Sequence, residues 1–344
     1  MRRSHPETPH PVPRDERPGS TVTLDEMAAG AYAERTLYRQ TVPKEETNLN
    51  ERRPDHVYGV LLLGLMGIGL SGIFVRYSGA PSLFTATWRL GFTVLIMAGM
   101  FTLRRGWGEL RGLKPAQAAW CALSGVCLAL HFTFWFESLR YTTVAASTVL
   151  VCTEVLFVAV GDVLFCKGRM SAGCWAAIGI SLVGSAVIAL GDGALGGSLE
   201  GALYGDALAL AAAFFVGAYT LIGRVQRASL STNTYTFVVY SFCLLTLLVM
   251  DFATGTPVVG LPLREFLPPL ALAVFSTLLG HSLFSYCLKY FPPAYVSAVK
   301  LAEPVIAAIV AVPCFGEWPT AATVAGGALI LLSLLFYTRQ EAAR

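Results

Sequence analysis

Three charged residues, Glu154, Glu303 and Arg89, lie in the middle of long apolar stretches, where a charged side chain could hold a solute or carry a proton. An ionisable side chain at the centre of a bilayer costs at least about 2.5–3.5 kcal/mol on insertion scales. Such a residue therefore indicates either a structural ion pair or a binding site. Each glutamate is also a candidate to carry a coupled proton, because a desolvated carboxyl binds a proton more readily.

Lys300 lies three residues before Glu303, a spacing that places both side chains on one face of a helix and allows them to pair. Pro304 cannot donate a hydrogen bond to the Lys300 carbonyl, so it predicts a free acceptor and a bend at this point. The pair either binds a substrate or forms a silent buried ion pair. Arg89 likewise either contributes to a site or ties its helix to a carboxylate or to backbone carbonyls.

Two histidines and a tryptophan, His131, His281 and Trp135, are further candidates for binding. His131 and Trp135 are four residues apart in an aromatic-rich stretch, so they share a helix face. A histidine in this setting is either a proton carrier or a hydrogen-bonded packing group. The predicted substrate site consists of Glu303, Lys300, Arg89, Glu154, His131, Trp135 and His281.

Sequence motifs for catalysis or for cofactor binding are missing. HExxH, GxSxG and a Gly-Lys-Ser/Thr phosphate loop do not occur, which argues against an intramembrane enzyme and against ATP-driven transport by this chain alone. The eight cysteines lie in or beside apolar runs without CxxC spacing, so we interpret them as small buried thiols. We predict no catalytic residue, no metal and no cofactor.

The composition predicts an integral membrane protein. Hydrophobic residues make up 55% of the 344 residues and charged residues 14%, whereas soluble domains carry about 25% charged residues. A net charge of +3 without a basic patch excludes nucleic acid as a partner. Residues 1–56 are polar and proline-rich and predict a disordered tail. Arg2-Arg3 is not followed by an apolar core, so no cleavable signal is expected.

After this tail the sequence contains ten apolar stretches of spanning length, since about 20 helical residues cross a hydrocarbon core of about 30 Å. Carboxylates near the ends of these stretches, such as Asp206 and Glu137, are expected to be solvated or to cap helices. The predicted spans are 57–77, 81–103, 116–138, 142–165, 171–190, 201–222, 233–253, 267–289, 293–313 and 319–337.

The distribution of lysine and arginine predicts that both termini are cytoplasmic, because cytoplasmic loops carry an excess of positive charge. With ten spans, the loops on the side of the termini hold nine of these residues: Arg104, Arg105, Arg111, Lys114, Lys167, Arg169, Arg224, Arg227 and Lys289. The opposite side holds only Arg76, Arg140 and Arg264. We expect a multi-pass protein of the cell (inner) membrane.

The sequence repeats itself at a spacing of 149 residues. Leu139-Arg140-Tyr141 matches Leu288-Lys289-Tyr290, and Glu154 matches Glu303. With one gap, Gly168-Arg169 matches Gly316-Glu317. A five-span repeat has odd parity, so the second copy must be inverted relative to the first. Inverted repeats are typical of secondary transporters, which bind substrate between the two copies; the alternative is a duplicated scaffold without transport.

The residues resemble the drug/metabolite transporter superfamily, specifically its EamA-type ten-span proteins. The resemblance extends over about residues 57–338. It rests on Phe74-Val75-Arg76, Ala80-Pro81 and Arg89, on the stretch Glu137 to Ser147, and on Ala302-Glu303-Pro304-Val305 and Phe315-Gly316-Glu317-Trp318-Pro319-Thr320.

This resemblance implies an all-α membrane protein with two inverted five-helix repeats, at 57–190 and 201–338, cytoplasmic termini and a central cavity. The sequence departs from the family pattern after Glu154, where Val155 replaces the expected proline. We therefore expect the fourth span to lack the bend predicted for the ninth.

The leading hypothesis is a secondary transporter for a small polar or amphipathic metabolite, with an amino-acid-like substrate favoured. The alternative is a non-transporting receptor or assembly partner that docks through its N-terminal tail. The expected partners are a small-molecule substrate and the lipid bilayer, with protons and a second copy of the chain as candidates.

Overall fold

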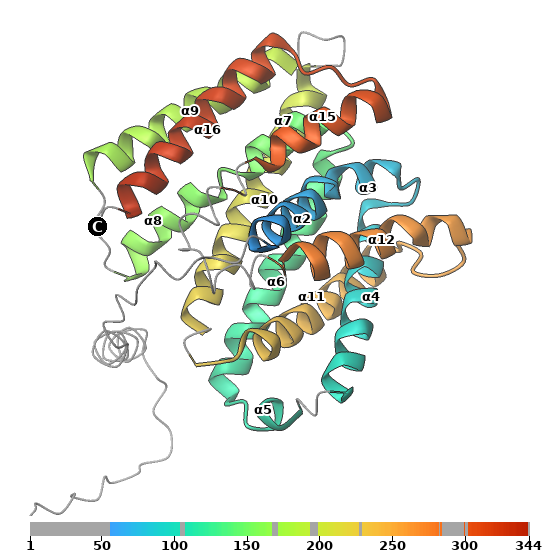
Figure 1. The fold of residues 1–344 in the computed structure, drawn as a ribbon. Coiled ribbons are helices and arrows are strands. Elements are labelled where there is room, and N and C mark those ends of the chain that lie inside the picture. The colour runs from blue at the N-terminus through green and yellow to red at the C-terminus, as the bar shows by residue number, and fades with distance from the viewer. Residues whose placement is uncertain are drawn as a thin grey trace, which may run out of the picture. The chain divides into compact units, whose positions relative to one another are not determined.

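The computed structural model describes residues 56–103, 107–166, 171–192, 199–226, 229–281, 283, 299 and 302–342. All of them belong to one compact unit, residues 49–344. Across these ranges the secondary structure is helical and contains no strand (Figure 1). The predicted tail lies outside the described residues except for its last residue, His56.

The helices follow one another in the order that the apolar stretches predict. They are α2 (His56–Gly69), α3 (Ser71–Tyr77), α4 (Ser82–Leu103), α5 (Trp107–Arg111), α6 (Pro115–Ser138), α7 (Val144–Val151), α8 (Glu154–Cys166), α9 (Ala172–Asp192), α10 (Leu199–Gln226), α11 (Thr232–Thr254), η2 (Leu263–Phe266), α12 (Leu267–Ala271), η3 (Leu272–His281), α15 (Glu303–Phe315) and α16 (Ala321–Ala342).

Six helical segments within the described ranges are long and apolar enough to cross a membrane. They are His56–Tyr77, Ser82–Leu103, Pro115–Ser138, Glu200–Gly223, Asn233–Thr254 and Leu263–Gly280. Four shorter apolar helices occupy the remaining predicted spans: Val144–Val158, Trp175–Gly184, Glu303–Phe315 and Ala321–Tyr337. The chain is thus a multi-pass α-helical membrane protein, and the count of ten spans stays a prediction.

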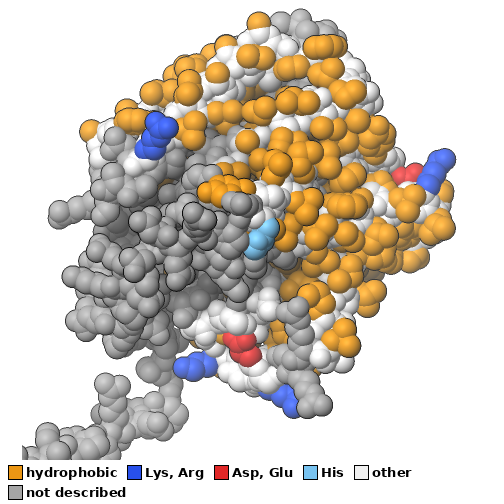
Figure 2. All heavy atoms as spheres, in the orientation of Figure 1, with side chains coloured by type: hydrophobic (Ala, Val, Ile, Leu, Met, Phe, Trp, Pro, Cys, Tyr) orange, Lys and Arg blue, Asp and Glu red, His pale blue; other side chains and the backbone are white. Residues whose placement is uncertain are grey.

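The surface of the helical unit is suited to lipid. Leu95, Leu182 and Val249 are each more than half exposed although they lie within predicted spans. Figure 2 shows hydrophobic side chains over most of the described part of one face, with charged side chains at its margins. A surface of this kind would be unfavourable in water and is the expected one in a bilayer.

Two of the predicted spans are broken at repeat-related positions. α7 ends at Val151 and α8 begins at Glu154, while α15 begins at Glu303 with Pro304 in its first turn. Glu154 and Glu303 are 149 residues apart in the sequence, so each glutamate begins a helix at the same point of its repeat.

The expectation that the fourth span lacks a bend is therefore wrong. The backbone N–H of Thr153 donates to the Leu150 carbonyl at 3.1 Å, and its hydroxyl donates to the same oxygen at 2.6 Å. A threonine hydroxyl competes with the helical hydrogen-bond ladder in this way. Thr153, the residue before Glu154, thus interrupts the fourth span. In the ninth span the residue expected to do so is Pro304, which follows Glu303.

The helices pack closely where glycines meet. α9 and α16 run side by side (Figure 1), and a Cβ atom added to Gly326 of α16 would lie 2.5 Å from the Gly184 carbonyl of α9. Likewise, a Cβ atom at Gly67 of α2 would lie 2.5 Å from the Phe275 carbonyl of η3. Small residues allow this approach, which supplies packing where lipid provides no hydrophobic driving force.

Candidate functional site

The centre of the unit contains a buried arginine, Arg89 of α4, which is 2% exposed. Its guanidinium carbon lies 4.2 Å from the ring centre of Phe132 and 5.8 Å from that of Phe136, both on α6. Its Nε donates to the Thr277 hydroxyl of η3 at 3.0 Å. The aromatic faces and the hydroxyl fix the guanidinium in one place, because a ring face attracts a cation.

The π-helical geometry of η3 places Thr277 where Arg89 can reach it. The Thr277 hydroxyl lies 3.2 Å from the Leu272 carbonyl, five residues earlier, and donates to it. Ser276 donates to the Gly67 carbonyl at 2.9 Å and so fixes the same turn to α2. π-Helical turns occur frequently at functional sites, and here such a turn presents a hydroxyl to a buried cation.

Part of the hydrogen-bonding capacity of Arg89 is unused. Its Nη1 has no hydrogen-bond partner, and within the described part of the chain no carboxylate lies at ion-pair distance from it. Tyr240, Cys243 and Glu303 interact with its charge at longer range, and Glu154 is not one of these groups. A buried charge with an unfilled donor is costly, so this atom is available to an anionic ligand.

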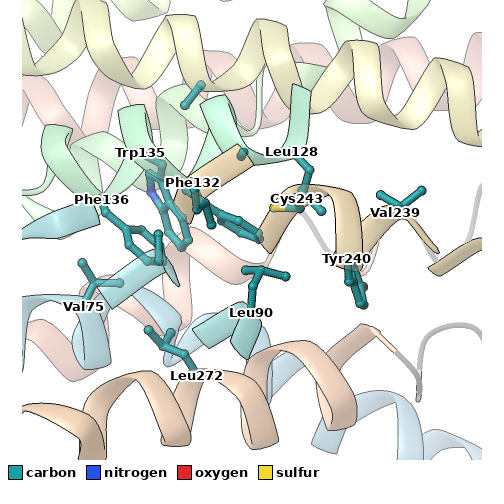
Figure 3. Close-up of a cluster of buried hydrophobic side chains, with 14 of the residues drawn as sticks. Val75, Leu90, Leu128, Phe132, Trp135, Phe136, Val239, Tyr240, Cys243 and Leu272 are labelled. Atoms are coloured by element: carbon teal, nitrogen blue, oxygen red, sulfur yellow. The ribbon is translucent and has the colours of Figure 1, made fainter. Parts of the chain in front are cut away.

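Trp135 supplies a second buried donor, next to Phe136. Trp135 is 5% exposed, its Nε1 has no hydrogen-bond partner among the described residues, and its ring centre lies 5.4 Å from that of Phe136. Figure 3 shows Trp135, Phe132 and Phe136 adjacent on α6. His131 stacks on Trp135 at 5.9 Å, and its Nδ1 is 2.9 Å from the Ala212 carbonyl of α10. His131 thus holds the indole in place.

The remaining predicted site residues either begin or end another helix or lie outside the described part of the chain. Glu154 begins α8, where its carbonyl would lie 3.3 Å from a Cβ added to Gly217 of α10. Lys300 lies outside the described residues, so its pairing with Glu303 and the free carbonyl expected before Pro304 stay predictions. His281 ends η3, but its side chain is outside the described part.

Three buried polar residues were not among the sequence-predicted site residues. Thr277 accepts a hydrogen bond from Arg89, and Tyr240 interacts with the Arg89 charge at longer range. No pattern in the sequence predicts either residue. Asp251 of α11 is fully buried and accepts from the Thr87 hydroxyl at 2.6 Å. Asp251 is the one carboxylate in the apolar stretch 233–253, and this is the feature that could have identified it from the sequence. The expectation that Asp206 is solvated or caps a helix is also wrong, because Asp206 is 3% exposed and lies inside α10, seven residues after the helix begins.

A separate acidic contact lies outside the spans. Glu109 of α5 accepts hydrogen bonds from the Ser231 backbone N–H at 2.7 Å and from the Thr234 hydroxyl at 2.6 Å, both at the start of α11. Partial burial raises the pKa of Glu109, but the hydrogen bonds from Ser231 and Thr234 lower it more, so the net pKa lies below its ordinary value. The ionised carboxylate therefore caps α11.

These features define a class: a multi-pass helical membrane protein with broken spans and unfilled buried donors between its helices, the organisation of a transporter. The chain belongs to the EamA-like transporter family, whose model matches residues 57–190 and 203–339. This confirms the resemblance that the sequence indicated.

Similar proteins agree with this assignment. A protein of Archaeoglobus fulgidus, described as an uncharacterized transporter, is 26% identical over 251 residues, covering 72% of this chain and 84% of that protein. One solved crystal structure superposes with a TM-score of 0.56 at 18% identity, covering 84% of this chain and 99% of its own. At that identity the likeness shows the fold alone.

Proposed function

We propose that this transporter moves a small zwitterionic metabolite of the amino-acid type, and that Arg89, Trp135 and Glu303 form its binding site. The observation that carries the proposal is the pair of unfilled N–H donors on Arg89 and Trp135, both buried and both bordering Phe136. Two fixed donors, one of them charged, suit a carboxylate, which accepts several hydrogen bonds.

Glu303 supplies the opposite charge. It is half-buried at the start of α15 and interacts electrostatically with Arg89 without forming an ion pair with it. A zwitterionic substrate could place its amine beside Glu303 and its carboxylate at Arg89. Lys300 and His281 remain candidates for the same site. Glu154, the repeat-related counterpart of Glu303, is a candidate for substrate binding in the first repeat or for proton coupling.

The proposed mechanism is alternating access by two inverted repeats, 57–190 and 201–338, with ten spans and cytoplasmic termini. Three observations support it. The family model matches two segments of nearly these bounds, the breaks before Glu154 and Glu303 are repeat-related, and α9 and α16, the last spans of the two repeats, pack together. Broken helices near the midplane are where such transporters bind substrates and ions.

The decisive experiment is uptake of a panel of amino acids and their deaminated carboxylic acids into proteoliposomes. Arg89→Ala should weaken uptake of both kinds of probe, because both carry a carboxylate. Glu303→Gln should weaken uptake of the amino acid alone. Loss of a charged hydrogen bond is worth about 1.5–3 kcal/mol, which corresponds to a rise in KM of about 10- to 100-fold.

Arg264→Ala is the matched control, because this arginine is largely exposed and pairs with its neighbour Glu265. It should leave uptake unchanged. If Arg89→Ala left the KM of every transported probe at the wild-type value, the site would be wrong. If no probe moved at all while the N-terminal tail bound a protein partner, the receptor hypothesis would replace transport. An imposed proton gradient that accelerates uptake by the wild type but not by Glu303→Gln would identify the coupling residue.

A further inference from the structure

The loops that follow α3, α6 and α15 meet on one face of the unit, which we call the distal face. Arg76, near the end of α3, forms an ion pair with Glu317, between α15 and α16, at an Nη2–Oε1 distance of 2.6 Å. In the proposed arrangement Arg76 belongs to the first repeat and Glu317 to the second. The pair therefore connects the two halves of the protein.

Both side chains of this pair make further hydrogen bonds. The second oxygen of Glu317 accepts from the Val144 N–H, the first of α7, at 3.1 Å. Arg76 Nη1 donates to the Leu139 carbonyl and, at 3.1 Å, to the Thr142 carbonyl. One carboxylate of the second half thus neutralises an arginine and caps a helix of the first half.

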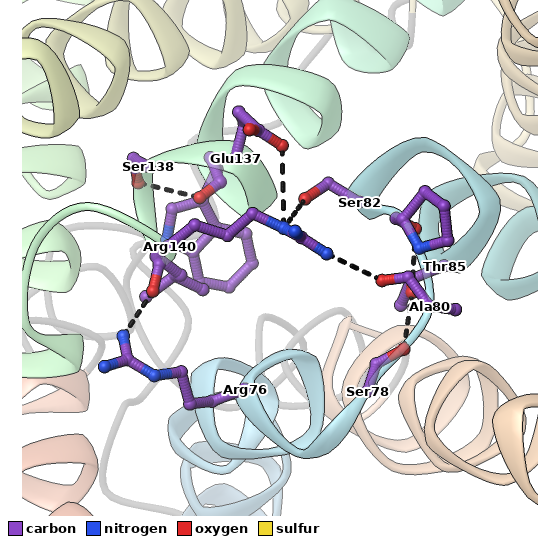
Figure 4. A network of polar contacts seen from close by, with 11 residues as sticks. Arg76, Ser78, Ala80, Ser82, Thr85, Glu137, Ser138 and Arg140 are labelled. Carbon is purple, nitrogen blue, oxygen red and sulfur yellow. Dashed lines mark hydrogen bonds and ion pairs between the residues drawn. The ribbon is translucent and has the colours of Figure 1, made fainter. Parts of the chain in front are cut away.

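The first half presents these groups as one rigid surface. Arg140 donates from Nε to the Ser82 hydroxyl at 3.0 Å and from Nη2 to the Ala80 carbonyl at 2.9 Å, which fixes the loop after α3 to the end of α6 (Figure 4). Glu137 lies 3.8 Å from Arg140 within the same half. Glu317, from the second half, thus docks against a framework that the first half holds together by its own hydrogen bonds.

An aromatic contact lies beside the ion pair. The rings of Tyr77 and Phe315 are 5.0 Å apart, and Cys314 precedes Phe315 in α15. Cys314 is partly buried and not bonded to another cysteine. Separation of the two halves at the distal face would break the Tyr77 contact and expose this thiol.

We propose that Arg76 and Glu317 form a gate that holds the distal face closed in this conformation and must separate when the site opens there. This inference rests on the proposed transport function. The Arg76 and Glu317 side chains are 33% and 15% exposed, so the pair is partly shielded from water and holds the face more firmly than a fully exposed pair would. Both groups still border water, so the contact can break when the site opens and form again within each transport cycle.

The gate acts on one face only. The sequence repeat matches Glu317 with Arg169, so the residue at the equivalent point of the first half carries the opposite charge. The same carboxylate cap is not available there. The two faces consequently differ in how they close, although the two halves share one fold.

The test measures how fast a membrane-impermeant maleimide labels Cys314 of the full-length protein in sealed vesicles of both orientations, without any substrate. Glu317→Gln keeps the shape of the side chain but removes its charge. We expect labelling from the distal side to rise about fivefold or more, because an open state populated at up to about 10% can become the major one. Arg76→Gln should give the same rise.

Two controls make the result specific. Glu137→Gln removes an ion pair at the same face but within one half, and should leave labelling at the wild-type rate. Cys314→Ser should abolish the additional signal in the Glu317→Gln background.

If both gate variants kept wild-type labelling and merely unfolded at lower temperature, the pair would be a static brace and the gate would be overturned. Uptake assays separate this result from a failure of the proposed function. Transport with unchanged labelling refutes the gate alone, whereas increased labelling without transport supports the closure and refutes transport.

Discussion

The crossing of α9 and α16 allows a quantitative prediction. A Cβ atom on Gly326 would lie 2.5 Å from the Gly184 carbonyl and 2.7 Å from Ile188 Cγ1, whereas ordinary contacts begin at 3.4 Å. Gly326→Ala therefore requires the helices to separate locally by about 0.9 Å. The hydroxyls of Ser181 and Ser333 also hydrogen-bond across this interface, so a separation would strain further contacts.

The expected cost is that of overpacking a well-filled interface, about 1–3 kcal/mol. The better helix propensity of alanine offsets it by at most about 1 kcal/mol. With a central cost of about 2 kcal/mol and an offset of about 1 kcal/mol, the net loss is about 1 kcal/mol. We therefore expect the variant to unfold at a temperature lower by about 2–4 °C, the shift that 1 kcal/mol produces in a domain of 150–250 residues.

The measurement is tryptophan fluorescence during heating of the detergent-solubilised protein, and Gly327→Ala is the matched control. A Cβ at Gly327 meets Val149 Cγ2 at 3.6 Å, an ordinary contact. The control should unfold at or above the wild-type temperature. If Gly326→Ala were as stable as Gly327→Ala, the two helices would not be in the close contact described above.

Three further predictions concern single side chains. The carboxylate of Glu109 has a pKa below its ordinary value of 4.5; its stabilising contribution is complete above that value and is lost as the pH falls through the folded-state pKa. The difference in unfolding temperature between wild type and Glu109→Gln should therefore vanish on acidification, and a constant difference would contradict the cap on Ser231. Thr153→Val removes the hydroxyl bond to Leu150 and should cost about 1 kcal/mol of stability, measured by thermal unfolding against Thr153→Ser. Trp135→Phe removes a donor that has no partner among the described residues, so the KM for uptake should rise while the unfolding temperature changes little. A fall in unfolding temperature without a rise in KM would assign the indole to packing alone.

The positions of the spans were predictable, because long apolar runs in a bilayer have few structural alternatives. Arg89 was also predictable as a site candidate, since the cost of burying a charge is visible in the sequence. Its partners were not. Thr277 reaches Arg89 through a π-helical turn and through tertiary packing against α2, and neither leaves a mark in local composition.

The break before Glu154 shows a different limit. A rule based on proline predicts no break there, yet the Thr153 hydroxyl produces one by bonding to Leu150. Threonine is common within membrane helices, so its presence alone does not predict this outcome. Only the pairing of Glu154 with Glu303 at the 149-residue offset could have suggested that both spans are interrupted at the same place.

The two broken spans bear on how the protein enters its membrane. α8 and α15 each have 13 residues, a length of about 20 Å at 1.5 Å per residue, against a hydrocarbon core of about 30 Å. Each break also leaves backbone groups that lipid cannot satisfy. These segments are therefore poor stand-alone insertion signals, and stable integration requires neighbouring helices such as α10, which packs on α8. The fourth and ninth spans should accordingly leave the insertion machinery together with their neighbours, so that biogenesis is cooperative at the two spans that carry Glu154 and Glu303.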